Sequence, residues 1–220
     1  QYALGRSLAT KYNTELKLDI SWYATVQDRR YELNNFRISA PIASKFEIEK
    51  FTGSLVKRVA RKLRLPVKHF ITQERVTRFD RTILDTGSSA YLDGYWQSES
   101  YFKEIEPALK KELIVAHEIK EKNKIIADQI TALGDRAISL HVRRGDYVSN
   151  AVASQVLGAA PLDYYERAIS SLTKDMNQPT FFIFSDDLEW VRKNLSIDHR
   201  VVYVDQNSPA KGYEDLRLMS

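Results

Sequence analysis

The spacing of apolar residues changes along the chain at residue 134. Beyond this point, short apolar runs alternate with segments in which apolar positions recur every three or four residues. The first pattern predicts buried strands and the second amphipathic helices. Strands that alternate with helices indicate an α/β fold with a parallel sheet. Strands are expected over 137–142, 180–184 and 200–204, and helices over 162–174 and 188–195.

The first part of the chain has a less regular pattern. Pro66 stops one expected helix and Gly134 closes another. The change of pattern after Gly134 predicts a domain boundary there, so that residues 1–134 and 135–220 form two domains. Helices are expected over 1–12, 48–65, 98–105 and 119–133, and extended segments over 16–20, 31–36, 76–84 and 90–96.

Length and composition allow a hydrophobic core and exclude several chemistries. The 220 residues suffice for one large domain or two small ones, and 43% of them are hydrophobic. The absence of cysteine excludes disulfides, thiolate metal ligands and a cysteine nucleophile. The four histidines are widely spaced and show no metal-ligand pattern. We therefore expect no metal site.

The net charge of +4 is mild, and much of the excess lies in a basic cluster at Lys57–Arg64. Such a cluster could meet nucleic acid or an anionic membrane face, but a solvated helix face is the more frequent explanation. No apolar stretch is long enough to span a bilayer, and no signal peptide is visible. A reducing compartment fits this composition.

The first candidate site follows the expected strand 137–142, which continues into Arg143, Arg144, Gly145 and Asp146. Guanidinium groups at the tip of a strand suit a phosphate, because they offer paired donors in a fixed fork and keep their charge. Side chains alternate along a strand, so His141 and Arg143 face one side and Arg144 the other. We expect Arg143 to contact the phosphate and Arg144 to pair with a carboxylate. A purely structural pairing of both arginines remains an alternative.

The second candidate site follows the expected strand 180–184, where Ser185, Asp186 and Asp187 begin a helix. Free backbone N–H groups at a helix N-terminus attract anions and hydroxyl-rich ligands. Asp186, followed three residues later by Glu189, also resembles a capping box. Ser185 or Asp187 could cap the helix equally well.

A third candidate lies over 91–102, where aromatic residues are dense and lie beside the polar residues Asp93, Gln97 and Glu99. Sugar C–H faces lie on aromatic rings, while carboxylates and amides take the hydroxyls. A core strand with aromatic packing explains the same pattern at least as well.

Together these segments resemble the family 11 glycosyltransferases, the α-1,2-fucosyltransferases, especially the bacterial members. The run His141–Asp146 matches the His-x-Arg-Arg-x-Asp motif of that family. Several weaker matches in the same order make the resemblance specific. They lie at residues 1–5, 94–98, 101–102, 164–169, 184–187 and 218–220.

The resemblance implies a GT-B-like α/β architecture of two Rossmann-like domains, with the donor site in the cleft between them. Residues 1–134 would form the acceptor-side domain and residues 135–220 the donor-binding domain. It implies inverting transfer of L-fucose from GDP-fucose to the 2-hydroxyl of a galactose-terminated glycan, with no metal and no further cofactor. The enzyme would be cytoplasmic and act in carbohydrate metabolism or protein glycosylation, and a location at the inner face of the membrane stays open.

The resemblance also implies roles for the motif residues. Arg143 first and Arg144 second would contact the donor diphosphate, with His141 beside them. Residues 185–187 would lie beside the nucleoside, with Asp186 the preferred contact. Asp146 is available as a general base or as a loop anchor, and the residues alone do not decide between these roles.

Family members extend beyond both ends of this sequence, with a glycine-rich loop before Gln1 and an Asn-Ser-Ser-Phe-Ser-Trp-Trp stretch after Ser220. The chain is therefore expected to be truncated at both ends, with an incomplete second domain. Three alternatives stay open: a related transferase of different sugar specificity, an inactive nucleotide-sugar-binding domain, and a nucleic-acid binder using 57–64. The last lacks any recognised module. Peripheral membrane association and oligomeric state stay undecided.

Overall fold

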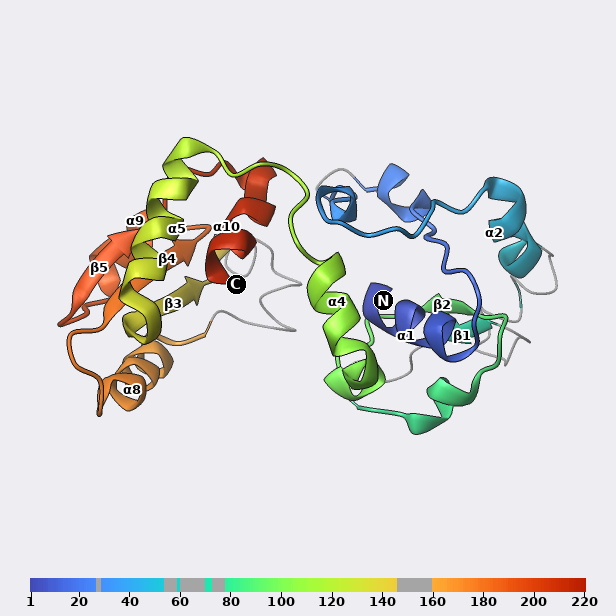
Figure 1. Ribbon diagram of the computed structural model, residues 1–220, viewed down its shortest axis with the longest axis horizontal. Helices are drawn as coiled ribbons and strands as arrows, with labels where there is room; N and C mark the ends of the chain where they lie inside the picture. The colour runs from blue at the N-terminus through green and yellow to red at the C-terminus, as the bar shows by residue number, and fades with distance from the viewer. Residues whose placement is uncertain (27–28, 54–58, 60–69, 73–77, 146–159) are drawn as a thin grey trace. The chain divides into compact units, whose positions relative to one another are not determined.

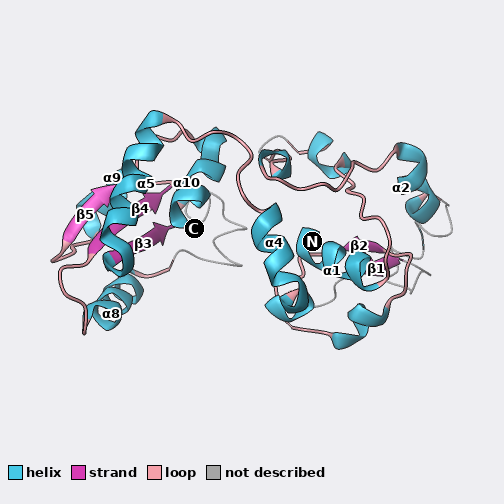
Figure 2. Ribbon diagram, viewed as in Figure 1, coloured by secondary structure: helices cyan, strands magenta, loops and turns pink. Residues whose placement is uncertain are grey.

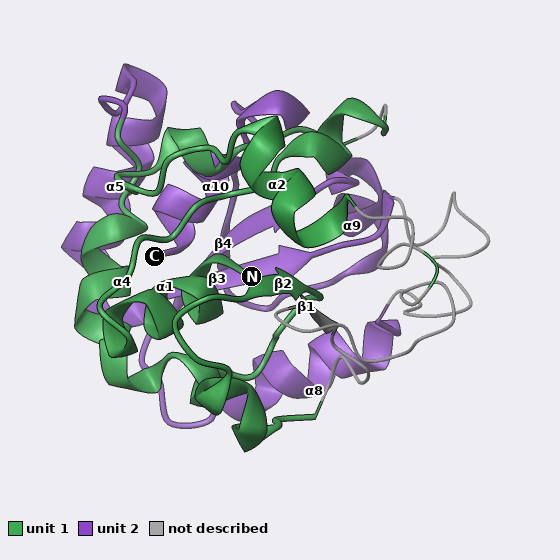
Figure 3. Ribbon diagram, turned by 90° about the vertical axis from the view of Figure 1, so that its right-hand side faces the viewer, with its two compact units in different colours: residues 1–116 green, residues 117–220 purple. Residues whose placement is uncertain are grey.

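The structure of the chain is a computed structural model that describes residues 1–26, 29–53, 59, 70–72, 78–145 and 160–220. Contacts between Cα atoms divide it into two compact units, residues 1–116 and residues 117–220 (Figure 3). Each unit has hydrophobic core clusters of its own, and each is described by itself below.

The second unit is built on a three-stranded parallel sheet in the order β3-β4-β5 (Figures 1 and 2). This confirms the α/β class and the parallel sheet that alternating strands and helices predicted. Its strands are β3 (Ala137–Val142), β4 (Thr180–Ser185) and β5 (Arg200–Tyr203), and its helices are α5 (Glu121–Leu133), α8 (Leu162–Thr173), α9 (Leu188–Asn194) and α10 (Gly212–Met219).

Helices cover both faces of this sheet, and the central strand β4 is buried on each side. Phe181 and Ile183 of β4 pack with residues of α8 and α9, including Ile169 and Val191. Phe182 and Phe184 pack on the opposite face with residues of α5 and α10, including Leu218. Because β4 faces helices on both sides, its side chains from residue 181 to residue 184 are buried, and this part of its sequence is therefore a continuous apolar run.

The predicted boundary after residue 134 differs from the division between the compact units. The helix α5 was expected in the first domain, but its apolar residues Ile126 and Ile130 pack against the cluster of Phe182 and Phe184. The apolar stripe of an amphipathic helix shows that one face is buried but not which sheet it packs against, and a closing glycine does not reveal that partner. The acceptor-side and donor-binding roles of the two parts stay predictions.

The first unit contains short elements around a small core. Leu4 and Leu8 of α1 are buried with Trp96 and Tyr101. The same helix is tied to α4, because the Tyr2 hydroxyl donates to Glu112 over 2.6 Å and Arg6 pairs with Glu112 over 2.9 Å. Its elements include α1 (Tyr2–Lys11), α2 (Lys45–Thr52), α4 (Glu106–Glu112) and the parallel pair β1 (Phe70–Thr72) and β2 (Tyr91–Asp93).

Several predicted elements of this unit were wrong. Segment 16–20 contributes one isolated bridge, Leu18 with Ile42, and 31–36 contributes a 3-10 turn and one bridge. Residues Arg81–Asp85 form a 3-10 helix where an extended segment was expected, and only Tyr91–Asp93 of 90–96 is a strand. Short apolar runs form strands only where a partner strand lies alongside, and tertiary contacts supply few partners here.

Helix boundaries depended on caps that the periodicity did not reveal. Helix α2 begins at Lys45 rather than residue 48, because Ser44 and Glu47 form a capping box. Helices α4 and α10 were not predicted. The predicted basic cluster at Lys57–Arg64 falls almost wholly outside the described residues. In the described part of the chain, no helix has the length and apolar character needed to cross a membrane.

Candidate functional site

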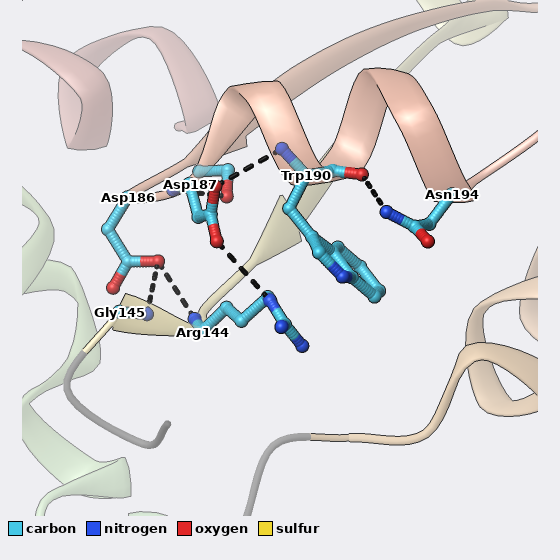
Figure 4. Close-up of polar contacts among 7 residues, drawn as sticks. Arg144, Gly145, Asp186, Asp187, Trp190 and Asn194 are labelled. Carbon is cyan, nitrogen blue, oxygen red and sulfur yellow. Dashed lines mark hydrogen bonds and ion pairs between the residues drawn. The ribbon is translucent and has the colours of Figure 1, made fainter. Parts of the chain in front are cut away.

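The parallel register of β3 and β4 brings the first two candidate segments together at one edge of the sheet. Val142 pairs with Ser185, so residues 143–145 and 185–187 both leave the sheet at its carboxyl edge. One oxygen of Asp186, Oδ1, accepts hydrogen bonds from the backbone N–H of Arg144 over 2.8 Å and of Gly145 over 3.0 Å (Figure 4). The Asp186 carboxylate therefore holds the turn after β3.

Residue 145 is a glycine at a point of close approach. A Cβ atom there would lie 3.0 Å from Oδ2 and 3.2 Å from Cγ of Asp186. A methyl group would press on the carboxylate that ties the turn, so glycine permits the approach.

The Arg144 side chain lies on the β4–α9 corner. Its Nε lies 3.3 Å from Asp187 Oδ2, and its Cζ lies 4.0 Å from the centroid of the Trp190 ring. The prediction that Arg144 pairs with a carboxylate is confirmed. Alternation along β3 explains the direction, because Val142, two residues before Arg144, also packs against α9.

The capping residue of α9 is Asp187, one of the alternatives that the sequence left open. Its Oδ1 accepts from the backbone N–H of Trp190 over 3.1 Å, while its own N–H donates to the Ser185 hydroxyl over 2.9 Å. Asp186 is not the cap, because its carboxylate points to the β3 turn. Ser185, Asp186 and Asp187 each make a contact that stabilises this corner of the fold. Their role beside a nucleoside stays a prediction.

The other residues of the arginine motif are only partly placed. Arg143 is exposed, as a phosphate contact requires. His141 points to the same side of the sheet as α5 and α10, but its side chain is also exposed. Asp146, the candidate general base, lies outside the described residues. The structure therefore brings Arg143, Arg144 and residues 185–187 to one edge of the sheet.

A buried polar network beside this edge was not predicted. Asn123 of α5 donates to Glu214 over 3.1 Å and to Asn207 over 3.0 Å, and Asn207 donates to Asp215 over 2.7 Å. Burial raises the pKa of Asp215, and Glu214 adds to this, whereas Asn207 and His141 oppose it. An asparagine within an otherwise amphipathic helix was the only sequence signal for this network.

Tyr164 and Tyr165 lie in the first turn of α8, near the same edge. Tyr165 is buried, and burial, Tyr164 and the Asp186 carboxylate raise its pKa. Tyr164 is 54% exposed, and its ring meets the Tyr165 ring edge-on at 5.3 Å. The Asp186 carboxylate thus lies within electrostatic range of Tyr165, which the sequence alone did not show.

The aromatic segment 91–102 is divided between core and surface. Trp96 and Tyr101 are core residues, with ring centroids 5.9 Å apart. Tyr95 is 71% exposed. Core packing therefore accounts for Trp96 and Tyr101, and a sugar platform in this segment stays a prediction.

No cluster of three or more His, Cys, Asp or Glu side chains suited to a metal occurs among the described residues. The edge instead offers guanidinium groups and a tightly held turn. Guanidinium groups bind anions through paired, permanently charged donors, and the Arg144 side chain is additionally oriented by Asp187.

Comparisons with known proteins agree on one family. The model of Glycosyl transferase family 11 matches residues 65–220. An alpha-1,2-colitosyltransferase of Escherichia coli is 32% identical over 202 residues, which cover 88% of this chain and 66% of that protein. The O-antigen biosynthesis glycosyltransferase WbnK of Escherichia coli is 26% identical over 245 residues, covering 100% of this chain and 79% of that protein.

A mammalian protein matches a smaller part. Galactoside 2-alpha-L-fucosyltransferase SEC1 of Bos taurus is 28% identical over 134 residues, covering 58% of this chain and 36% of that protein. The chain thus spans 66% of the length of the colitosyltransferase and much less of the mammalian protein. No solved structure matches it.

Proposed function

Because the chain belongs to glycosyltransferase family 11, we propose that it transfers L-fucose from GDP-fucose to the 2-hydroxyl of a galactose-terminated glycan. The family match over 65–220 and the α-1,2 linkage in the name of the Escherichia coli colitosyltransferase support this proposal. The transfer inverts the anomeric centre and uses no metal. The complete enzyme has the GT-B architecture and works in the cytoplasm, at the inner face of the membrane.

The donor binds at the carboxyl edge of β3 and β4. The observation that carries this placement is the parallel register, which sets the turn of Arg143 beside Asp186 at the edge where α/β folds bind ligands. Arg143 is the first contact of the diphosphate and Arg144 the second, with His141 beside them. Residues 185–187 lie on the nucleoside side.

The chemistry requires positive charge at this edge. Fucose leaves through an oxocarbenium-like transition state while negative charge builds on GDP. Without a metal, fixed cations must stabilise that charge, and each charge-assisted hydrogen bond contributes about 1.5–3 kcal/mol. The acceptor hydroxyl must lose a proton to a general base. Asp146 is the candidate base from the sequence.

The relatives are named for two different sugars, colitose and fucose. The relative in Escherichia coli is named for colitose, which is fucose without its 3-hydroxyl. The arginine motif recognises the diphosphate rather than the sugar, so it fits GDP-fucose and GDP-colitose equally. A donor competition assay with both compounds and a galactoside acceptor therefore decides the sugar.

Isothermal titration calorimetry with GDP tests the site. Wild-type protein binds GDP, and Arg143→Ala weakens binding at least tenfold, because one charged contact is lost. Arg136→Ala is the matched control, since Arg136 lies at the amino end of β3 and also carries one positive charge. Chelation with EDTA leaves binding and transfer unchanged.

Three results would count against the proposal. If the wild-type protein does not bind GDP, the proposed donor site is wrong. If Arg143→Ala and Arg136→Ala lose GDP affinity equally, the assignment of Arg143 is wrong. GDP binding without transfer of fucose or colitose would favour the alternative of a nucleotide-sugar-binding domain.

A further inference from the structure

We propose that Trp190 is a positioning residue of the donor site and that it acts through Arg144. This inference rests on the proposed function and goes beyond it, because Trp190 belongs to none of the predicted contacts. It names the side chain that holds one of the two motif arginines in a fixed orientation.

Two groups hold the Arg144 guanidinium from different directions. The face of the Trp190 ring lies under it, with 4.0 Å from Cζ to the ring centroid, well inside the range of a cation–π contact. The Asp187 carboxylate accepts a hydrogen bond from Nε of Arg144 over 3.3 Å (Figure 4). A planar guanidinium can satisfy both contacts at once, which a lysine ammonium cannot.

The ring is needed because the ion pair alone is weak. A single contact of 3.3 Å between side chains that are 24% and 37% exposed leaves a long arginine free to change rotamer. The ring blocks one side and fixes the plane of the guanidinium. Within the described part of the chain, Nη1 and Nη2 of Arg144 have no hydrogen-bond partner, so they remain available to an anion.

Trp190 and Asp187 also hold each other. The same Asp187 carboxylate that pairs with Arg144 accepts the backbone N–H of Trp190 through Oδ1. Asp186 meanwhile binds the backbone of Arg144, so the β4–α9 corner fixes both the main chain and the side chain of this residue. Arg143 lies directly before this fixed point, between it and the end of β3 at Val142.

A second cation–π pair in the same unit provides a matched control. Arg192 lies with its Cζ 4.5 Å from the Tyr203 ring centroid and pairs with Asp205 over 2.8 Å. Tyr203 packs against the same core cluster as Trp190. Tyr203→Leu therefore removes an aromatic ring and a cation–π contact without touching Arg144.

The first measurement is ligand-free. The Hε resonance of Arg144 is shifted upfield by the Trp190 ring current in the wild-type protein, and the shift is lost in Trp190→Leu and largely kept in Trp190→Phe. The second measurement is GDP affinity. Trp190→Leu weakens GDP binding about tenfold, the range of a partly desolvated cation–π contact, and Trp190→Phe restores most of it. Tyr203→Leu leaves GDP affinity unchanged.

A double-mutant cycle shows whether Trp190 acts through Arg144. In an Arg144→Met background, Trp190→Leu changes GDP affinity less than about twofold. An undiminished tenfold loss in that background would overturn the inference, as would wild-type affinity in Trp190→Leu. Wild-type protein that fails to bind GDP would overturn the proposed function as well, and the Hε shift would then still report whether the ring holds Arg144.

Discussion

At the scale of single residues, Gly145 shows how one missing side chain keeps the candidate site in place. Its Cα approaches the Asp186 carboxylate so closely that a Cβ would lie 3.0 Å from Oδ2. We expect Gly145→Ala to displace the carboxylate and weaken its bonds to two backbone N–H groups, lowering the free energy of unfolding by about 1–3 kcal/mol. Urea unfolding measures the change.

Gly212→Ala is the control for that substitution. Nothing lies within 4 Å of a Cβ at residue 212, which begins α10. Alanine there should leave stability unchanged or raise it by about 0.4–1 kcal/mol, because the unfolded chain loses entropy. Equal effects of the two substitutions would show that the approach of Asp186 is not restrictive.

Asp215 gives a prediction whose sign follows from its surroundings. Burial raises its pKa above the ordinary 3.8, so the folded state favours the neutral carboxyl. The associated stability is present below pH 3.8 and is lost as the pH rises through the higher folded pKa. Asp215→Asn should therefore stabilise the protein at pH 7 and have little effect at pH 3.

The comparison uses urea unfolding at both pH values. The asparagine keeps an oxygen to accept from Asn207, which donates to Asp215 Oδ1 over 2.7 Å in the wild-type protein. A wild-type protein that is more stable than Asp215→Asn at pH 7 would show that His141 or another partner compensates the buried charge.

At the scale of elements, caps decided where helices begin. The Ser44 hydroxyl and the Glu47 carboxylate close the N-terminus of α2 reciprocally, and Lys17 also binds Glu47. The Lys17 ammonium, followed by Ser44, lowers the pKa of Glu47 to about 2 from the ordinary 4.5. The capping box was readable in the sequence, but the contact with Lys17 was not.

The pH dependence of α2 follows from this shift. The contribution of Glu47 is present above pH 4.5 and is lost as the pH falls towards 2, because the unfolded state takes up the proton first. An NMR titration should give a Glu47 pKa near 2 and show α2 amides losing protection in this interval. In Glu47→Gln the acid-dependent loss should disappear; its persistence would assign the loss to another carboxylate.

At the scale of the whole molecule, each compact unit has a core of its own. Phe181 is fully buried in the second unit, and Leu4 is 1% exposed in the first. Phe181→Ala should cost about 3–5 kcal/mol and Leu4→Ala about 2–5 kcal/mol. In hydrogen-exchange mass spectrometry, each substitution should reduce protection mainly in its own unit. Equal loss in both units from either substitution would indicate one cooperative molecule.

Sequence alone determined the part of the fold that depends on local pattern. Continuous apolar runs with helical segments between them identified β3, β4 and β5 and their parallel direction, because strands buried on both faces need such runs. The same reasoning placed the arginine turn and residues 185–187 at strand ends. The apolar residues of the first unit show only weak periodicity, which did not predict several of its elements correctly. Its short strands and 3-10 turns depend on partners distant in sequence.

Only the tertiary structure decided how those ends meet. It turned Asp186 to the β3 backbone, selected Asp187 as the helix cap and laid the Arg144 guanidinium on Trp190. It also placed α5 on the second sheet and built the buried network of Asn123 and Glu214. Except for the cap of α9, these outcomes join residues far apart in the sequence, such as Arg144 and Asp186 or Asn123 and Glu214. Periodicity does not encode such contacts, because it reports only which face of an element is buried.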